Sequence, residues 1–487
     1  MHKPHKRVPL TENFTENIAY LHKRLGVDKS FDVIQVDLKY ANRKMALFLI
    51  DGFVKDDIML YIMRALSHLK ESDLDDQPLD TLMKTHIPYI EIGTEDDLEI
   101  IIDQVLSGPV AMIVEGVSTA ILIDARTYPV RGPEEPDVER VVRGARDGFV
   151  ETIVFNTAMT RRRIRDRSLR MEYMQIGRRS KTDICISYLE DIADPSHVAE
   201  IKKALESIDT DGLPMAEKTI EEFIFKEFKN PYPLARYTER PDTAASHLFE
   251  GHVIIIVDGS PSVLITPTTF FHHLQHAEEY RQKPIIGTYL RGVRFLGVWL
   301  SLFMLPLWFL LAITPELLPD ALAYIGVDDS GVVPLLFQFL IIEVGLDLLR
   351  MAAIHTPSSL ATALGLVAAV LIGQVAVEVG LFSNEVILYL SIAAIGTFAT
   401  PSYELSIANR LFRIFLLLTT GLFGVVGFVV GVTFWVLFLV RLKGFDVPYL
   451  WPLLPFNREA LKDVLLRAPI PLKHHRPKIL HPKDPDR

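Results

Sequence analysis

The sequence predicts a water-soluble α/β region, then an α-helical transmembrane bundle of four to five segments, and then a short basic tail. The first observation behind this prediction is the uneven distribution of charge. Residues 1–291 hold 37 Lys and Arg and 47 Asp and Glu, whereas residues 292–440 hold only 4 and 9. Residues 441–487 then hold 10 and 5. Because about 20 apolar residues span a bilayer, the charge-poor middle excludes a wholly soluble protein.

The second observation is the alternation of strand and helix signals in the first 291 residues, which is typical of the α/β class. Short apolar runs indicate strands, and apolar residues at helical spacing indicate the helices between them. The expected strands are Phe31–Leu38, Lys44–Phe53, Pro109–Glu115 and Thr119–Asp124, and the expected helices are Asp56–Leu69 and Glu95–Leu106.

The third observation is an internal repeat. Ser107–Ile123 matches Glu250–Thr266 at an offset of 143 residues. Lys44–Phe53 and its following helix resemble Lys181–Glu190 and its following helix at an offset of 137. Two matched elements in the same order indicate two similar α/β subdomains, a possible duplication, with a boundary in the proline-rich stretch 129–136. The alternative is chance, since apolar hairpins with a glycine turn resemble one another.

No catalytic constellation is visible in the soluble region, so we expect neither enzyme activity nor a cofactor. Asp258 beside Ser260 could be read as an acid next to a nucleophile, but an Asp-Gly pair between β-branched runs first indicates a hairpin turn. His272 and His276 have the i, i+4 spacing of metal ligands. Because they lack a complete ligand set, the favoured interpretation is the polar face of a helix, and no metal is expected.

The basic run Arg161–Arg170 allows two interpretations: a phosphate-binding patch, or a solvated or subunit-facing side of a helix. The domain is acidic and no interleaved aromatic residues accompany the run, so the second is favoured and no nucleic-acid partner is expected. The single cysteine, Cys185, excludes an internal disulfide.

Five apolar segments are long enough, or nearly so, to cross a membrane. They are Val293–Ile313, Gly331–His355, Leu360–Leu381, Val386–Thr400 and Leu411–Leu442. The fourth has only about 15 residues and could be re-entrant or broken, which leaves the count at four to five. Positive charges before the first segment place the N-terminal region in the cytoplasm. Five full crossings would put the basic tail outside, against the same rule, and an even number of crossings would reconcile the two.

The second segment contains Glu343 and Asp347 at i, i+4 on one helix face, with Gln338 above them and Arg350 below. A carboxylate at membrane depth is costly unless it is paired or faces water. We interpret these residues as an ion pathway, a proton relay or a gate. The alternative is a structural ion pair of Asp347 with Arg350, which would leave Glu343 protonated. Glu378, near the outer end of the third segment, could join the pathway or simply reach headgroup water.

Small residues recur every four positions along one face of the third segment, and similarly in the fifth. They are Ala361, Gly365, Ala369 and Gly373 in the third, and Gly421, Gly424, Gly427 and Gly431 in the fifth. Such stripes let membrane helices approach closely. They predict tight packing within one chain or between copies, and the resemblance described next implies that the third-segment stripe is also a candidate pore lining.

Several motifs together resemble the A subunits of the GerA family of spore germination receptors. In the soluble region they are Arg143–Phe149, the basic run from Arg161, Asn230–Pro233, Tyr237–Asp242 and Glu250–Pro261. In the membrane region they are His355–Ser358, Ala399–Glu404 and Pro448–Phe456. One departure is Ala145, where the family usually has proline.

This resemblance implies a multi-pass protein of the spore inner membrane that acts in germination, with its N-terminal domain in the cytoplasm. It implies a homo-oligomer, in contact with membrane lipid, around an ion-conducting pore near the third segment. It also implies other germination-receptor or small membrane proteins as partners. Phe270–Arg281 and Arg476–Pro482 resemble a branch of the family that is not the nutrient-sensing subunit. The family has no catalytic residues to transfer to this chain.

The function expected from these observations is an ion channel, or channel subunit, that releases cations from the spore core. One alternative is a proton-coupled secondary transporter that binds its proton at Glu343 and Asp347. Another is a membrane scaffold that recruits other germination proteins.

The expected domains are two cytoplasmic α/β subdomains, a transmembrane domain and a basic tail, at residues 1–130, 131–291, 292–442 and 443–487. The tail could be an ordinary flexible terminus or could rest on anionic headgroups.

Overall fold

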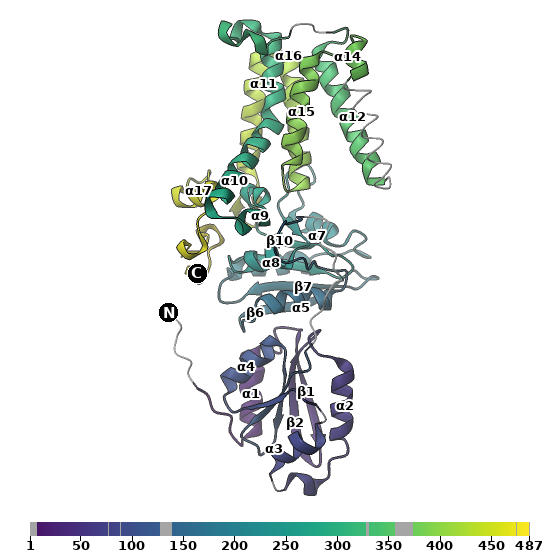
Figure 1. Ribbon diagram of the computed structural model, residues 1–487, viewed down its shortest axis with the longest axis vertical. Coiled ribbons are helices and arrows are strands. Elements are labelled where there is room, and N and C mark those ends of the chain that lie inside the picture. The colour runs from purple at the N-terminus through teal and green to yellow at the C-terminus, as the bar shows by residue number, and fades with distance from the viewer. Residues whose placement is uncertain are drawn as a thin grey trace. The chain divides into compact units, whose positions relative to one another are not determined.

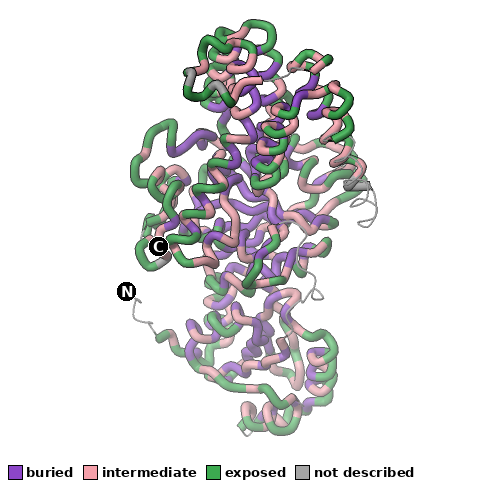
Figure 2. The backbone as a smooth tube through the Cα atoms, turned by 45° about the horizontal axis from the view of Figure 1, so that its top comes forward, coloured by how far each residue is buried: buried purple, intermediate pink, exposed green. Residues whose placement is uncertain are grey.

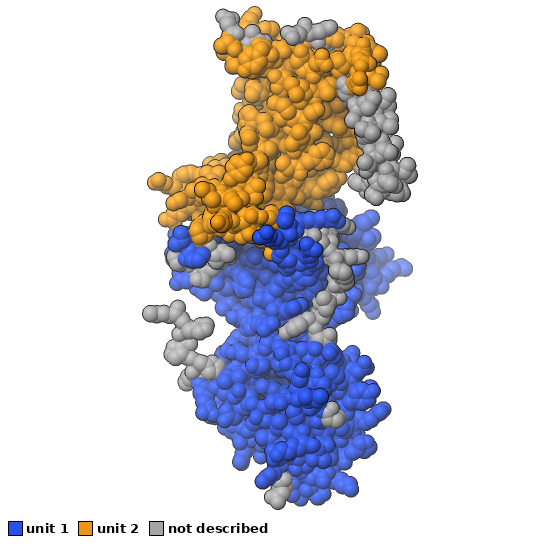
Figure 3. Space-filling model, viewed as in Figure 1, with its two compact units in different colours: residues 1–228, 235–267, 470–487 blue, residues 229–234, 268–469 orange. Residues whose placement is uncertain are grey.

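The computed structural model describes residues 7–75, 77–87, 89–126, 139–327, 331–355, 374–473 and 475–486. The chain divides into two compact units, coloured separately in Figure 3. Unit 1 comprises residues 1–228, 235–267 and 470–487, and unit 2 comprises residues 229–234 and 268–469. The predicted boundary at 129–136 and most of the predicted third segment lie outside the described residues. So does the whole stripe of Ala361, Gly365, Ala369 and Gly373.

The first half of unit 1 contains a five-stranded antiparallel sheet of order β1-β2-β4-β5-β3. Figure 1 shows α1 and α4 on one face of this sheet and α2 on the other. The strands are β1 Val33–Tyr40, β2 Arg43–Ile50, β3 Ile92–Glu95, β4 Val110–Val114 and β5 Ala120–Ile123. The helices are α1 Phe14–Leu25, α2 Asp56–Leu66, α3 Pro78–Thr81 and α4 Leu98–Ser107, with short turns η1 Glu71–Leu74 and η2 Leu82–His86.

The second half of unit 1 contains a sheet whose strands follow the same order, β6-β7-β9-β10-β8. The strands are β6 Leu169–Ile176, β7 Thr182–Leu189, β8 Arg236–Thr238, β9 Val253–Val257 and β10 Val263–Thr266. The helices are α5 Ile153–Arg163, α6 Pro195–Glu206, α7 Ala216–Phe225 and α8 Pro241–Leu248. Each strand therefore occupies the position of its counterpart in the first sheet, which agrees with the pair of similar subdomains that the repeat predicts.

The two-residue period of the strands divides the first subdomain into two cores, one on each face of the sheet. In β2, Phe48 and Ile50 pack with α1 and α4, whereas Met45 and Leu47 pack with α2. The central strands β4 and β9 are buried along their whole length, which explains why their sequences are uninterrupted apolar runs. Figure 2 shows the buried residues gathered mainly in the interior and the exposed residues mainly around them.

The last part of the basic tail, residues 470–486, packs on the second subdomain within unit 1. Its short turns are η8 Ile470–Leu472 and η9 Lys478–Leu480, and Leu480 is fully buried. The backbone N–H of Lys483 donates to the Ile192 carbonyl at 2.9 Å, and its Nζ donates to the Glu190 carbonyl at 3.0 Å. The tail is therefore held by specific contacts rather than being an unattached terminus.

Unit 2 is mainly helical. After the turn η3 Phe270–Leu274 and helix α9 Ala277–Arg281, α10 Pro284–Trp299 continues through η4 Leu300–Met304 into α11 Leu305–Ile313. The remaining helices are α12 Leu335–His355, α14 Ala376–Glu378, α15 Asn384–Phe398, α16 Tyr403–Arg441 and α17 Arg458–Leu465. The short elements are η5 Pro315–Leu317, η6 Asp320–Ile325, and the strands β11 Lys443–Gly444 and β12 Val447–Pro448.

Helix α16 is not straight, because it folds back on itself at Gly424. This residue has φ 56° and ψ −134°, a conformation that only glycine adopts without strain. In a straight helix Phe412 and Phe434 would lie about 33 Å apart, yet their ring centroids are 6.3 Å apart. Residues 403–423 and 425–441 are therefore two antiparallel legs of a helical hairpin, which we call the first and second legs of α16.

The predicted count of four to five membrane segments is wrong for the part of the chain that the structure describes. There, two helices are long and apolar enough to cross a membrane, Pro284–Ile313 and Tyr403–Arg441. Helix α12 includes two carboxylates and an arginine among its 21 residues, and α15 has only 15 residues. At 1.5 Å per residue α15 spans about 22 Å, which is short of a hydrocarbon core of about 30 Å.

Candidate functional site

The predicted carboxylates of α12 lie in a cluster of charged side chains with two arginines from the first leg of α16. We call Glu343, Asp347, Arg410 and Arg413 the charge cluster. Glu343 is fully buried, and its Oε1 lies 2.6 Å from Nη2 of Arg413 and its Oε2 3.7 Å from Nε of Arg410. Arg410 also forms an ion pair with Asp347, whose side chain is 45% exposed. Two positive and two negative groups thus neutralise one another.

Arg413 connects the charge cluster to two further helices. Its Nη1 donates to the backbone carbonyl of Ser301 in η4, and lies 3.4 Å from the hydroxyl oxygen of Thr397 in α15. Beside the cluster, Trp308 of α11 and Phe339 of α12 belong to one apolar core with Leu417. The ion pair of Glu343 and Arg413 is therefore at the centre of the helical packing.

The structural ion pair of Asp347 with Arg350 is not the arrangement seen. Arg350 instead lies over the rings of Phe398 and Tyr403, with its guanidinium carbon 5.6 and 5.8 Å from the ring centroids. Such cation–π contacts suit an arginine near a helix end. Asp347 instead forms an ion pair with Arg410, which belongs to the first leg of α16.

The other predicted site residues lie apart from the charge cluster. Gln338 is fully buried, donates to the Val333 carbonyl at 2.6 Å and accepts from the backbone N–H of Ser383 at 2.9 Å. It thereby fixes the start of α15 relative to α12. Glu378 is exposed and accepts a hydrogen bond from Gln374 at 3.1 Å. The structure thus joins Glu343 and Asp347 into one site and leaves Gln338 and Glu378 outside it.

Sequence reasoning did not include Arg410 and Arg413 among the candidate site residues. A usable signal was present, because Arg410 and Arg413 are three residues apart and so share one face of their helix. Glu343 and Asp347 are four residues apart and share one face of α12. Two like-charged pairs of opposite sign on two apolar helices favour pairing between those helices.

The basic run 161–170 lies at the junction between the two sheets of unit 1. Arg161 is 1% exposed and donates from Nε to Oδ2 of Asp32 at 2.9 Å, while Arg170 pairs with Glu190. Arg167 pairs with Glu99 at the start of α4. These three arginines pair with carboxylates of the same chain, and Arg161 and Arg170 are buried, so they do not form the solvated or subunit-facing side of a helix that was expected.

Glu99 is the most strongly perturbed acid of this junction. Burial would raise the pKa of its carboxyl, but hydrogen bonds from Tyr20, Arg167 and Arg24 outweigh burial and lower the pKa to about 2. Glu99 is therefore ionised throughout the physiological range, and it links α1, α4 and the segment before β6.

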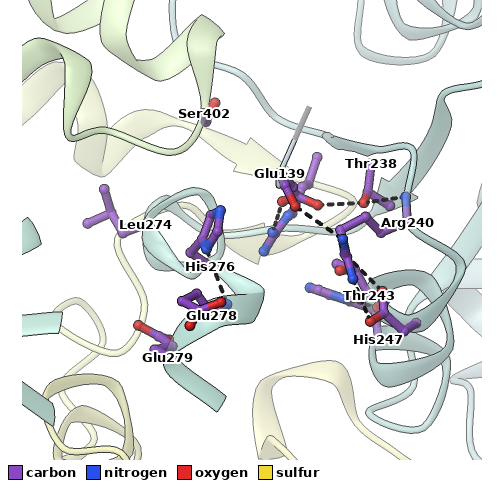
Figure 4. A network of polar contacts seen from close by, with 12 residues as sticks. Glu139, Thr238, Arg240, Thr243, His247, Leu274, His276, Glu278, Glu279 and Ser402 are labelled. Atoms are coloured by element: carbon purple, nitrogen blue, oxygen red, sulfur yellow. Dashed lines mark hydrogen bonds and ion pairs between the residues drawn. The ribbon is translucent and has the colours of Figure 1, made fainter. Parts of the chain in front are cut away.

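A second buried polar network surrounds Glu139, in the stretch that precedes α5 (Figure 4). Its carboxylate accepts from the Thr238 hydroxyl at 2.6 Å and pairs with Arg236, with both side chains 6% exposed. Arg240 is fully buried, donates to the Glu139 carbonyl at 3.3 Å and binds both carboxylate oxygens of Asp242. Every charge of the network has a partner, so its role is to hold β8 and α8 in place.

The two histidines with metal-ligand spacing do not share a helix face. His272 lies in η3, where its Nδ1 accepts from the backbone N–H of Thr269 at 3.0 Å. His276 caps α9, and its Nδ1 accepts from the backbone N–H of Glu278 at 3.2 Å (Figure 4). The helix expected across both residues is interrupted at Gln275, whose backbone is extended.

Comparison with known proteins gives consistent matches along most of the chain. The profile of the family described as "Bacillus/Clostridium GerA spore germination protein" matches residues 19–479. The stage V sporulation protein AF of Bacillus subtilis (strain 168) is 51% identical over 483 residues, covering 99% of this chain and 98% of that protein. The spore germination protein KA of the same organism is 30% identical over 484 residues, covering 98% and 88%.

One solved structure is also similar, the crystal structure of the N-terminal domain of the A subunit of the Bacillus megaterium spore germinant receptor GerK3. It is 28% identical and covers 55% of this chain and 99% of that chain, with a TM-score of 0.44.

Proposed function

This chain belongs to the GerA family of spore germination proteins, and from that premise we propose that it is a membrane subunit that releases cations from the spore core. Its two apolar helices and its family indicate association with a membrane. The membrane we propose is the spore inner membrane. We further propose a homo-oligomer in contact with lipid and with other germination proteins, without a catalytic role.

The observation that carries the ion-release proposal is the buried ion pair of Glu343 with Arg413. An unpaired carboxylate in an apolar helix bundle is costly, so the pair stabilises the arrangement of helices seen here. Parting the pair would leave a carboxylate and a guanidinium that both require water. A separation of α12 from the first leg of α16 would therefore favour a hydrated path between them, which is the property of a gate.

The membrane topology that fits this proposal has an even number of crossings. Residues 470–486 of the tail pack in unit 1 together with the two N-terminal sheets, which supports placing both on the same side of a membrane. A basic tail on the N-terminal side also agrees with the preference of positive charge for the cytoplasm.

The testing experiment measures K⁺ efflux from liposomes that contain the purified full-length protein. We compare the wild type with Glu343→Gln, which leaves Arg413 without its counter-charge, and with the exposed control Glu378→Gln. Removing one partner of a buried pair costs about 3 to 5 kcal/mol. If even a third of that cost favours the open state, efflux rises about tenfold, and the control stays at the wild-type rate.

Each other outcome points to a different function. Efflux that saturates and requires a counter-substrate or a proton gradient indicates the secondary transporter, in which the charge cluster binds the coupling proton. No efflux from any variant, with intact oligomer present in the vesicles, refutes cation release by this chain alone and indicates either that a partner must open it or that it is a scaffold. Equal efflux from wild type and Glu343→Gln keeps the channel but removes the charge cluster from its gate.

A further inference from the structure

A short segment that interrupts unit 1 belongs to the helical unit. Residues 229–234 lie between α7 and β8, both in unit 1, yet this segment packs within unit 2. It contains Tyr232, which is 2% exposed. The Tyr232 ring lies among three other rings of unit 2, with centroid distances of 5.5 Å to Phe412, 6.3 Å to Phe438 and 6.2 Å to Tyr449.

The hydroxyl of Tyr232 bonds to both legs of α16 at once. It accepts from Nε1 of Trp435, on the second leg, at 2.6 Å. It donates to Oδ1 of Asn409, on the first leg, at 3.0 Å. One oxygen from outside the hairpin therefore joins its two legs at the end far from Gly424.

These hydrogen bonds differ in kind from the other contacts between the legs. Phe412 and Phe415 meet Phe434 and Phe438 through their rings, and ring contacts tolerate sliding and rotation. A hydrogen bond weakens steeply as its angle and distance depart from the optimum. The hydroxyl thus defines the register of the legs, while the rings supply most of the apolar burial.

The first leg is also the element that supplies both arginines of the charge cluster. Asn409 directly precedes Arg410, and Arg413 follows one turn later on the side of Asn409. Any displacement of the leg at Asn409 therefore changes the distances from Arg410 and Arg413 to Glu343 and Asp347.

We propose that Tyr232 is a positioning residue, which holds the two legs of α16 in register and so keeps Arg410 and Arg413 against Glu343 and Asp347. Along the chain, the loop that carries Tyr232 leads directly into β8. That Tyr232 bridges the two legs is inferred from its hydrogen bonds to Asn409 and Trp435 alone. Its effect on cation release rests on the proposed function.

The neighbouring Tyr449 provides a matched control. It is fully buried beside Tyr232, and within the described chain its hydroxyl has no hydrogen-bond partner. Burial raises the pKa of both phenols, so each retains its proton at neutral pH. Tyr→Phe removes one oxygen from the same type of environment at both positions, but only at Tyr232 does it remove hydrogen bonds.

The test is hydrogen exchange of the full-length protein in detergent, followed in peptides from both legs of α16. Tyr232→Phe is expected to speed exchange in both legs about tenfold, and Tyr449→Phe to change it less than twofold. The same Tyr232→Phe change made in an Asn409→Ala background is expected to add little, since the bridge is already broken. Equal exchange in Tyr232→Phe and Tyr449→Phe would overturn the proposal.

Cation efflux from liposomes separates this inference from the proposed function. If Tyr232→Phe speeds both exchange and efflux, and Tyr449→Phe neither, the positioning role and its link to the gate are both supported. If exchange rises and efflux does not, Tyr232 positions the legs and the link to cation release is refuted. If efflux changes without any change in exchange, the positioning role itself is refuted.

Discussion

The buried ion pair of Arg161 with Asp32 offers the sharpest test of how unit 1 is held together. Arg161 lies at the end of α5 in the second subdomain, and Asp32 directly precedes β1 in the first. Both side chains are 1% exposed, and the guanidinium donates to both carboxylate oxygens at 2.9 and 3.3 Å. The same guanidinium also donates to the carbonyls of Asp166 and Leu169 at 3.1 and 3.2 Å.

The substitution Arg161→Met keeps much of the side-chain volume and removes all four hydrogen bonds. It leaves the Asp32 carboxylate buried without its cation, which costs about 3 to 5 kcal/mol. For a domain of 150 to 250 residues, each kcal/mol lowers the melting temperature by about 2 to 4 °C. We therefore expect the melting temperature of unit 1 to fall by about 6 to 20 °C.

The two units can be followed separately by spectroscopy. All four tryptophans, Trp299, Trp308, Trp435 and Trp451, belong to unit 2, whereas both five-stranded sheets belong to unit 1. The infrared band of β-sheet should therefore melt earlier in Arg161→Met, while the tryptophan fluorescence transition stays in place. The control is Arg162→Met, the exposed neighbour on the same helix, which should shift neither signal by more than about 2 °C.

A double variant tests whether the cost comes from the unpaired charge. Arg161→Met with Asp32→Leu removes both charges, so it should melt at a higher temperature than Arg161→Met alone. The reasoning is refuted if Arg161→Met melts within 2 °C of the wild type. It is also refuted if the double variant loses the sum of the two single-variant losses in melting temperature. Such additivity would mean that Arg161 and Asp32 do not stabilise one another.

Three further predictions concern other parts of the chain. Gly427→Ala should destabilise the α16 hairpin by at least 2 kcal/mol, because the added Cβ would meet the Thr419 carbonyl, whereas Gly292→Ala, with open space around it, should be nearly neutral in thermal unfolding. Glu99→Gln should lower the free energy of unfolding at pH 7, and it should make this free energy fall less steeply as the pH is lowered, which acid unfolding curves would measure. The folded pKa of Glu99 is depressed to about 2, so its contribution of about 1 to 2 kcal/mol exists above its unfolded pKa near 4.5 and disappears as pH falls toward 2. Leu480→Ala should lose about 2 kcal/mol of tail docking, since Leu480 is fully buried, and limited proteolysis should then cut residues 470–486 while the sheets remain intact.

Local pattern was sufficient for the architecture of unit 1. The apolar runs at 45–50, 110–114 and 253–257 are local features of the sequence, and they correspond to β2, β4 and β9. The offsets of the repeat also predicted that β9 and β10 would take the places of β4 and β5. A strand reveals its buried face within five residues, so a sequence is enough to find it.

Pattern failed where a long apolar stretch hides a turn. Residues 411–442 have the composition of one continuous helix, and the stripe of Gly421, Gly424, Gly427 and Gly431 indicated helix packing without indicating its partner. In the structure Gly424 takes a conformation that reverses the chain, and Gly427 and Gly431 face the first leg. Composition reports how apolar a segment is, but it does not report the direction in which the segment runs.

The sequence by itself determined the α/β class of unit 1, the apolar character of unit 2 and the family, and it singled out Glu343 and Asp347 as candidate site residues. Only the tertiary structure decided what these carboxylates face, because Arg410 and Arg413 are about 65 residues away along the chain. The spacing of residues within one helix does not identify the helix that packs against it. The same holds for Tyr232, whose partners Asn409 and Trp435 are brought to one hydroxyl by the reversal at Gly424. Charge and periodicity are local properties of a sequence, whereas the pairing of buried polar groups depends on which segments meet in the folded chain.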